Sequence, residues 1–352
     1  MLKAVDKDTG ELIWSVQAEN WEEGYTITSA PLYFEGMVIT GFAGAEFAAR
    51  GRVKAYSADD GSLLWTFYTV PGPGEFGFES WPQDSDAWKT GGGTVWHTPA
   101  VDPELGMIYF STGNPGPDYN GAVRGGDNLF TASIVALDVY TGEYRWHFQQ
   151  VHHDLWDFDA PNPVVLFDLE YDGELRKGLA QAGKTGWVYI VDRTNGVPLV
   201  GIEERPVPQE ERQLTAATQP YPVGDAFVTQ TLDIPPEGFQ LTNDGAIFTP
   251  FWEDPVLLRR SEANWPPSAV DPETGVMYVC AGERQAAYSS RADVDQVENG
   301  ERYTGGSMRF APISTTGVVA AIDLRTNKLL WSQRWPCLLY TSDAADDLLC
   351  VD

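Results

Sequence analysis

One phrase recurs along the chain and constrains its fold more than any other feature. AVDKDTGELIW (residues 4–14) returns as AYSADDGSLLW (55–65), ALDVYTGEYRW (136–146) and AIDLRTNKLLW (321–331), with a shortened copy at residues 189–200. Each copy is typical of a strand with alternating apolar residues, a tight turn, and a second strand that ends in tryptophan. Repetition of this kind indicates a fold built from similar units placed side by side.

The segments between the copies also favour strands. APLYFEGMVITG (30–41), PAVDPELGMIYFSTG (99–113) and SAVDPETGVMYVCAG (268–282) each have a glycine-centred turn between apolar runs, and helical periodicity is almost absent. A four-stranded propeller blade takes about 40 to 50 residues, so the spacing of the copies predicts an all-β chain, a β-propeller with about six blades. We expect the recurrent tryptophans to dock one blade onto the next; they are Trp14, Trp65, Trp146 and Trp331.

Three inserts depart from the strand pattern. Residues 71–93 and 114–128 are rich in glycine, proline and acidic residues, and residues 201–245 are rich in proline and glutamine without clear strands. Connecting loops are where a propeller usually places its function. We therefore expect the inserts to cover one end of the propeller.

The charge of the chain excludes one class of partner. Asp and Glu number 51 against 23 Lys and Arg, which gives a net charge of −28 spread along the 352 residues. Because nucleic-acid phosphates would be repelled, we expect no nucleic-acid partner. The first residues, MLKAVDKDTG, show no export signal, and no apolar run is long enough to span a membrane. The three cysteines lack metal-site spacing.

The last stretch differs from everything before it. Residues 337–352, CLLYTSDAADDLLCVD, contain no glycine, no strand pattern and two of the three cysteines. We interpret them as a non-native tail from adapter read-through, with a genuine acidic tail as the alternative. Residues 1–336 are then expected to form a partial propeller domain, and because the chain opens in mid-pattern it reads as a fragment.

Oxygen-bearing side chains follow predicted strands at glycine-rich turns. They are Glu46 in GFAGAEFAARG, Asn114 in YFSTGNPGP, and Asp157 and Asp159 in VHHDLWDFDAP. Hard cations such as Ca²⁺ take several oxygen ligands, so these residues are candidates for a metal site. The alternative is that they are solvated or cap the backbone, as acids and amides at turns usually do.

Seven phrases in order give the chain a family resemblance. TSAP, GAEFAARG, GGGTVW, STGNPGP, RGGDNLF, HHDLWDFD and KTGWVYIVDRTNG, interleaved with the tryptophan repeats over about residues 3–335, strongly resemble the pyrroloquinoline quinone (PQQ)-dependent alcohol dehydrogenases. That resemblance implies an eight-bladed propeller with PQQ and a metal ion near its axis. This chain would then hold about six of the eight blades.

The resemblance implies roles for the acidic and amide residues. Glu46 and Asn114 fall on the family's metal ligands, and Asp157 falls on the residue described as both catalytic base and metal ligand. Asp159, two residues later, matches an additional aspartate that marks lanthanide-using methanol dehydrogenases. The same pattern also resembles the membrane glucose dehydrogenase branch, where it does not establish lanthanide use. The expected metal is therefore Ca²⁺, with a lanthanide as the alternative.

The resemblance also implies a set of cofactor contacts. Trp96 matches the tryptophan on which PQQ stacks, and Lys184 matches the basic group that hydrogen-bonds the quinone oxygens. The remaining matches are the hydroxyls of Thr28 and Thr94, the main chain of Gly44 and Ala45, and Asn264.

Together these matches imply an oxidoreductase. Asp157 would take the hydroxyl proton of a primary alcohol, a polyol or a sugar while hydride moves to PQQ, with the metal polarising the quinone carbonyl. The family also implies a cytochrome c or a membrane quinone as electron acceptor and a periplasmic or extracellular location. The competing hypothesis is a non-enzymatic propeller similar to outer-membrane assembly scaffolds, which share the tryptophan repeat.

Overall fold

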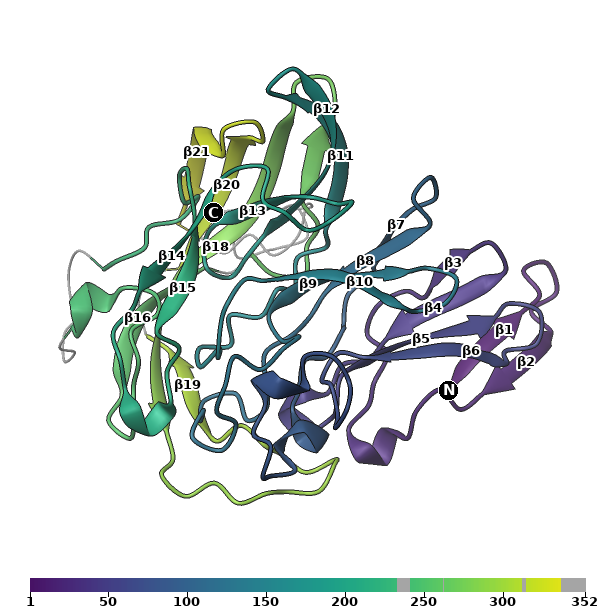
Figure 1. Cartoon of the computed structure of the whole chain (residues 1–352), viewed down its shortest axis with the longest axis horizontal. Coiled ribbons are helices and arrows are strands. Elements are labelled where there is room, and N and C mark those ends of the chain that lie inside the picture. Colours follow the sequence, from purple (N-terminus) through teal and green to yellow (C-terminus); the bar gives the residue numbers. More distant parts are fainter. Residues whose placement is uncertain (233–240, 262, 312–314, 337–352) are drawn as a thin grey trace.

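The computed structural model describes residues 1–232, 241–261, 263–311 and 315–336, and the proposed tail at 337–352 lies outside this part of the chain. The described residues form strands and short 3₁₀ helices, as Figure 1 shows. No helix in the described ranges is long and apolar enough to cross a membrane. The prediction that strands dominate is therefore confirmed.

Most of the strands form short antiparallel sheets that follow chain order. The first three sheets are β1 (Leu2–Val5) with β2 (Leu12–Val16); β3 (Leu32–Phe34), β4 (Met37–Gly41), β5 (Arg52–Ser57) and β6 (Leu63–Tyr68); and β7 (Ala100–Asp102), β8 (Met107–Ser111), β9 (Ser133–Asp138) and β10 (Tyr144–Gln149). The next two are β11 (Val165–Tyr171), β12 (Glu174–Ala182) and β13 (Val188–Asp192), then β14 (Ile202–Pro206) with β15 (Thr218–Pro222).

The last sheet is larger because β18 is long. This sheet contains β16 (Val256–Ser261), β17 (Ala269–Asp271), β18 (Val276–Ser290), β19 (Gly306–Phe310), β20 (Thr316–Asp323) and β21 (Lys328–Trp335). The first half of β18 pairs with β17 and β20, and its second half continues beyond them to pair with β16 and β19. The 3₁₀ helices are η1 (Trp21–Glu23), η2 (Ala45–Phe47), η3 (Phe78–Ser80), η4 (Ala87–Thr90), η5 (Glu211–Gln213) and η6 (Asn243–Gly245).

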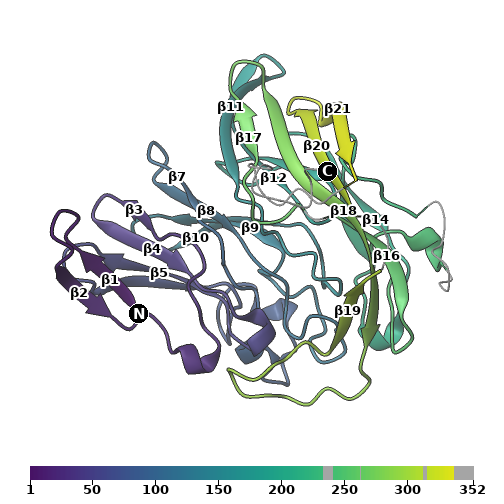
Figure 2. The same ribbon diagram turned by 180° about the vertical axis from the view of Figure 1, so that it is seen from behind.

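Separate apolar layers lie between several pairs of these sheets. One layer packs β4 and β5 against β8 and β9, the next packs β8 and β9 against β12 and β13, and another packs β11 to β13 against β18 and β20. Figures 1 and 2 show the sheets side by side in an open series. The core is thus divided into layers between neighbouring sheets, which is the packing expected of propeller blades.

Trp14, Trp65 and Trp146 each dock onto the following repeat, as predicted. Trp331 is 49% exposed, so its predicted docking is not confirmed within the described residues. The indole of Trp65 is 8% exposed, donates to the carbonyl of Val139 at 3.1 Å, and lies over Gly142 in the turn of the next repeat. The same arrangement joins Trp14 to Ala58 and Gly61, and Trp146 to Arg193 and Gly196. Gly61, Gly142 and Gly196 are therefore the seats of the tryptophans in the preceding repeats.

This contact predicts that Gly142→Ala destabilises the protein more than Gly10→Ala does. Both glycines have positive φ, 71° and 75°, so both substitutions carry similar backbone strain. A Cβ at Gly142 would lie 2.7 Å from the Trp65 ring, whereas one at Gly10 meets nothing within 4 Å. We expect Gly142→Ala to lower the free energy of unfolding by about 1–3 kcal/mol more than its control, measured by urea denaturation. Equal losses would show that the ring moves aside without cost.

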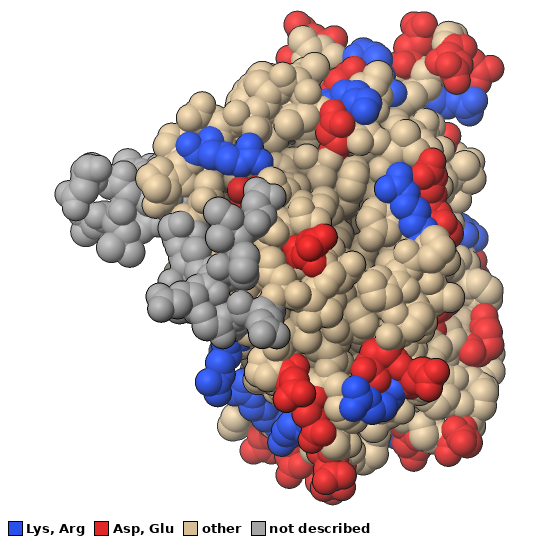
Figure 3. Space-filling model, turned by 90° about the vertical axis from the view of Figure 1, so that its left-hand side faces the viewer, with Lys and Arg blue, Asp and Glu red and all other residues tan. Residues whose placement is uncertain are grey.

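Charge is distributed over the surface in small patches. On the face shown in Figure 3 the blue patches are small and mostly lie beside red ones, and much of the middle of the face is uncharged. The surface ion pairs of the molecule include Arg145 with Asp138 and Lys89 with Asp86. Exposed pairs of this kind contribute little to stability, so we assign them no role in holding the fold.

Candidate active site

The loop after β10 presents the central carboxylates of the site. Trp156 and Phe158 are each 1% exposed and pack in an apolar cluster that includes Leu258 and Tyr288. The Trp156 indole also donates to the carbonyl of Thr249 at 2.8 Å. Anchoring two alternate residues in this way fixes the residue between them. Asp157 lies there with φ 55°, a conformation that non-glycine residues adopt rarely and that recurs at functional sites.

Two buried cations hold the carboxylates of this loop. The Lys184 ammonium lies 3.2 Å from Oδ1 of Asp157 and also forms an ion pair with Asp159. The Arg260 guanidinium donates to Oδ2 of Asp157 at 2.8 Å. Lys184 and Arg260 are only 5% and 2% exposed, so both cations are shielded from solvent. Trp96 completes the group, because its indole donates to Oδ2 of Asp159 at 3.1 Å.

The two carboxyl groups differ in their affinity for protons. Burial raises the pKa of Asp157, but the charges and hydrogen bonds of Lys184 and Arg260 outweigh burial and leave this pKa below its usual value. Burial, together with the charge of Asp157, raises the pKa of Asp159 to about 7, with Lys184 opposing the rise. One ionised acid and one acid that holds its proton more tightly therefore share Lys184.

A cavity of about 790 Å³ lies beside this group. Thr28, Trp96, Pro163 and Trp265 are among the residues that line it. The Thr28 hydroxyl donates to the main-chain carbonyl of Trp96 at 2.9 Å, which ties two distant segments together at the cavity wall. The cavity thus combines aromatic surface with a hydroxyl group, and the Trp96 ring reaches from its wall to Asp159.

The candidate metal ligands Glu46 and Asn114 lie on different loops. Glu46 lies in η2 and is exposed, and Gly44 precedes that turn with φ 129°. A Cβ at Gly44 would lie 2.2 Å from the Gly24 carbonyl oxygen, so the turn requires glycine there. Asn114 is buried, and its main-chain carbonyl accepts from the Gly93 amide at 2.8 Å.

The other predicted contacts lie close to these loops or bond locally. Ala45 is buried within η2, and the main-chain carbonyl of Thr94 accepts from the Gly113 amide at 2.8 Å, next to Asn114. Asn264 precedes Trp265 of the cavity wall, but its side-chain oxygen accepts from the Trp265 amide at 2.9 Å. The structure thus joins Asp157, Asp159, Lys184 and Trp96 directly, while Glu46, Asn114, Thr94 and Asn264 lie on other loops.

The oxygen donors have the chemistry of a hard-cation site, but cations of the chain hold two of them. Within the described ranges, no three His, Cys, Asp or Glu side chains are grouped closely enough to hold a metal ion. Asp157 and Asp159 instead bond Lys184, Arg260 and Trp96. The donor types suit Ca²⁺ or a lanthanide, and their carboxylates are neutralised by the protein itself.

Three buried residues near the site had not been predicted from the sequence. Arg260 lies on β16, more than a hundred positions after Asp157 in the sequence. Two adjacent arginines in a strand match no functional motif, so the sequence did not indicate its role. Asp118 is 3% exposed with a pKa raised well above its usual value by burial and by the charges of Glu46 and Asp157. This places Asp118 within electrostatic reach of both. Arg124, which is fully buried, lies near Asp118 and bonds the carbonyl of Pro117 at 3.0 Å.

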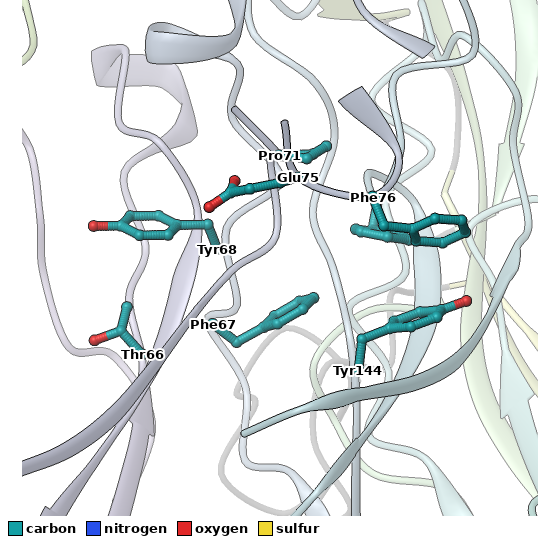
Figure 4. Close-up of a pocket in the computed structure, with 8 residues that line it drawn as sticks. Thr66, Phe67, Tyr68, Pro71, Glu75, Phe76 and Tyr144 are labelled. Carbon is teal, nitrogen blue, oxygen red and sulfur yellow. The ribbon is translucent and has the colours of Figure 1, made fainter. Parts of the chain in front are cut away.

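A second cavity, drawn in Figure 4, has a different character. It has a volume of about 280 Å³ and is lined by aromatic rings from β6, β10 and the loop after β6, including Phe67, Phe76 and Tyr144. None of its described lining residues is basic, and its one carboxylate, Glu75, pairs with Arg50. It therefore lacks the cation that an acidic cofactor would need.

Comparisons with known proteins decide the family. A model of the PQQ family, described as "Glucose/ethanol/alcohol dehydrogenase, beta-propeller domain", matches residues 11–338. The chain belongs to the PQQ dehydrogenase family. Its fold is accordingly a β-propeller, and the resemblance found in the sequence is confirmed.

Individual members of the PQQ dehydrogenase family match nearly the whole chain. Quinoprotein alcohol dehydrogenase PedH of Pseudomonas putida is 32% identical over 95% of this chain and 56% of its own length. The structure of quinohemoprotein alcohol dehydrogenase from Comamonas testosteroni matches with a TM-score of 0.73 and 28% identity, covering 96% of this chain and 52% of that one. A europium-containing methanol dehydrogenase also gives a TM-score of 0.73, at 26% identity, covering 97% of this chain and 60% of that one. The chain spans about half the length of these relatives.

Proposed function

We propose that the whole protein is a PQQ- and metal-dependent dehydrogenase that oxidises alcohols, with Asp157 as general base. The observation that carries this proposal is the bonded group of Asp157, Lys184, Asp159 and Trp96 beside a cavity of about 790 Å³. Membership of the PQQ dehydrogenase family supports it, since the named relatives are alcohol and methanol dehydrogenases.

The residues of the site suit a flat, acidic cofactor. Trp96 offers an aromatic face at the cavity wall, and Lys184 supplies a buried positive charge. Bound PQQ would supply the two-electron acceptor for the hydride of the substrate. Thr28, Thr94, Asn264 and the main chain of Gly44 and Ala45 remain proposed contacts of this cofactor.

Asp157 has the properties of a base for the substrate hydroxyl. Its lowered pKa keeps it ionised near neutral pH, so it can accept the proton of an alcohol. Lys184 and Arg260 hold the two carboxylate oxygens and so fix the direction in which the proton must arrive. The packing of Trp156 and Phe158 keeps this loop in place and excludes water from behind it.

Glu46, Asn114, Asp157 and Asp159 are the residues proposed to hold the metal ion. The ion would act as a Lewis acid that polarises the quinone carbonyl. The likeness to a europium-containing methanol dehydrogenase supports including a lanthanide beside Ca²⁺ in any test.

The wider setting follows from the family. We propose residues 1–336 as part of a larger propeller domain, a periplasmic or extracellular location, and a cytochrome c or membrane quinone as electron acceptor. The net negative charge of the chain would attract a basic cytochrome. Polyols and sugars are proposed as substrates beside simple alcohols.

The test uses the whole protein with added PQQ and either Ca²⁺ or La³⁺. We expect PQQ to quench tryptophan fluorescence through Trp96, and we expect dye-linked oxidation of ethanol or glucose with at least one ion. A Trp96→Phe variant should lose part of the quenching, while Trp21→Phe, whose ring is 75% exposed, should not. If neither quenching nor oxidation occurs with either ion, the non-enzymatic scaffold is the better reading.

A further inference from the structure

Arg260 is placed at Asp157 by a part of the sheet that extends beyond the blade. β16 pairs with the second half of β18, where Arg260 lies opposite Arg284. From there the Arg260 side chain donates to the Trp156 carbonyl at 2.8 Å, to the Tyr288 hydroxyl at 3.1 Å and to Oδ2 of Asp157 at 2.8 Å. These bonds on a guanidinium that is 2% exposed define one orientation.

The carboxyl groups of Asp157 and Asp159 already face two cations of the chain. Asp157 and Asp159 provide two carboxyl groups, and Lys184 and Arg260 provide two permanent or strongly held positive charges. An ion that binds Asp157 must therefore approach a carboxylate whose Oδ2 already faces a guanidinium at 2.8 Å. Like charges held a few ångströms apart in a buried site repel strongly.

We propose that Arg260 is a built-in counter-ion of Asp157 that competes with the metal ion and so sets how tightly the site binds it. The inference deepens the proposed function, because it takes Asp157 as a metal ligand. Arg260 holds the carboxylate in its working direction before the ion arrives, and the cost of placing the ion near the guanidinium weakens its binding. The residue is thus a positioning residue with a measurable effect on metal affinity.

The test measures Ca²⁺ and La³⁺ binding to the whole protein without PQQ, by titration calorimetry. Arg260→Gln removes the charge but keeps a hydrogen-bond donor, and we expect it to bind either ion at least about tenfold more tightly than the unmodified protein. Arg260→Lys keeps the charge, so its affinity should stay within about threefold. Arg145→Gln, at an exposed surface pair, should leave binding unchanged.

The outcomes separate this inference from the proposed function. Tighter binding by Arg260→Gln supports it even if the protein oxidises no alcohol, since no turnover is measured. Binding by Arg260→Gln alone, with none by the unmodified protein, also supports it. Equal or weaker binding by the variant, or binding by neither protein, overturns it. Arg260→Met serves as a second charge-free variant, and failure of both charge-free variants to fold would assign Arg260 a structural role and overturn the inference.

Discussion

Replacing Asp157 with asparagine is expected to lower dye-linked alcohol oxidation by the whole protein by about a thousandfold or more. General-base contributions fall between roughly a hundredfold and ten-thousandfold, and an amide cannot accept the proton. Asparagine has nearly the same shape and can still accept bonds through its oxygen, so the loop should keep its fold. The measurement is kcat with saturating PQQ and metal.

Two controls make this result specific. PQQ-induced quenching of tryptophan fluorescence should persist in Asp157→Asn, because Trp96 and Lys184 are unchanged. Asp86→Asn alters an exposed acid that pairs with Lys89, and its rate should match that of the unmodified protein. A rate for Asp157→Asn within tenfold of the unmodified protein would remove Asp157 as the base.

Arg124→Met is expected to cost about 3–5 kcal/mol of the free energy of unfolding at pH 8, because it removes a buried charge from among buried acids. Besides Pro117, Arg124 donates to Oδ1 of Asn128 at 2.8 Å and to the carbonyl of Asp154 at 2.5 Å. Its charge also opposes the burial that raises the pKa of Asp154 to about 6. Without the guanidinium, Asp118 and Asp154 lose the positive charge that opposes the effect of burial on their carboxyl groups.

The sign of the pH dependence follows from those raised pKa values. Folding raises the pKa of Asp154 from about 4 in the unfolded chain to about 6, so the folded state loses stability as pH rises between these values. In Arg124→Met the folded pKa rises further, so the deficit against the unmodified protein should grow from pH 5 to pH 8. Urea denaturation at both pH values checks this, with Arg145→Met at the surface as the control. A deficit that is constant with pH would show that lost hydrogen bonds, and not charge, cause it.

The sequence predicted the repeat architecture because the repeat is local. Three of the copies, residues 4–14, 55–65 and 136–146, contain both a turn glycine and a tryptophan, so packing of Trp65 against the next repeat could be expected from the pattern. The inserts were harder to interpret. Residues 201–245 gave no clear strands, yet β14 and β15 pair there, with Ile202 opposite Pro222. A two-stranded ribbon has free outer edges, where a proline that cannot donate a hydrogen bond is tolerated.

The site was predicted only in part, because the sequence shows local patterns and does not show contacts between distant segments. Asp157, Asp159 and Lys184 stand in two short phrases that the resemblance could match, and the structure brings them together. Arg260 reaches Asp157 only because β18 continues past its blade and carries β16 with it. Asp118 is defined by burial next to Glu46, which no local pattern records. Contacts that depend on the extension of a strand or on burial leave no repeating residue pattern in the sequence.

The contacts between the tryptophans and their glycine seats also determine the order in which the repeats unfold. The indoles of Trp14, Trp65 and Trp146 each join one repeat to the following one, and each apolar layer lies between two neighbouring sheets. In such a chain of nearest-neighbour couplings, loss of one seat loosens two repeats and leaves the others engaged. Backbone amides should then exchange with solvent in steps that follow the order of the sheets, with protection graded from repeat to repeat.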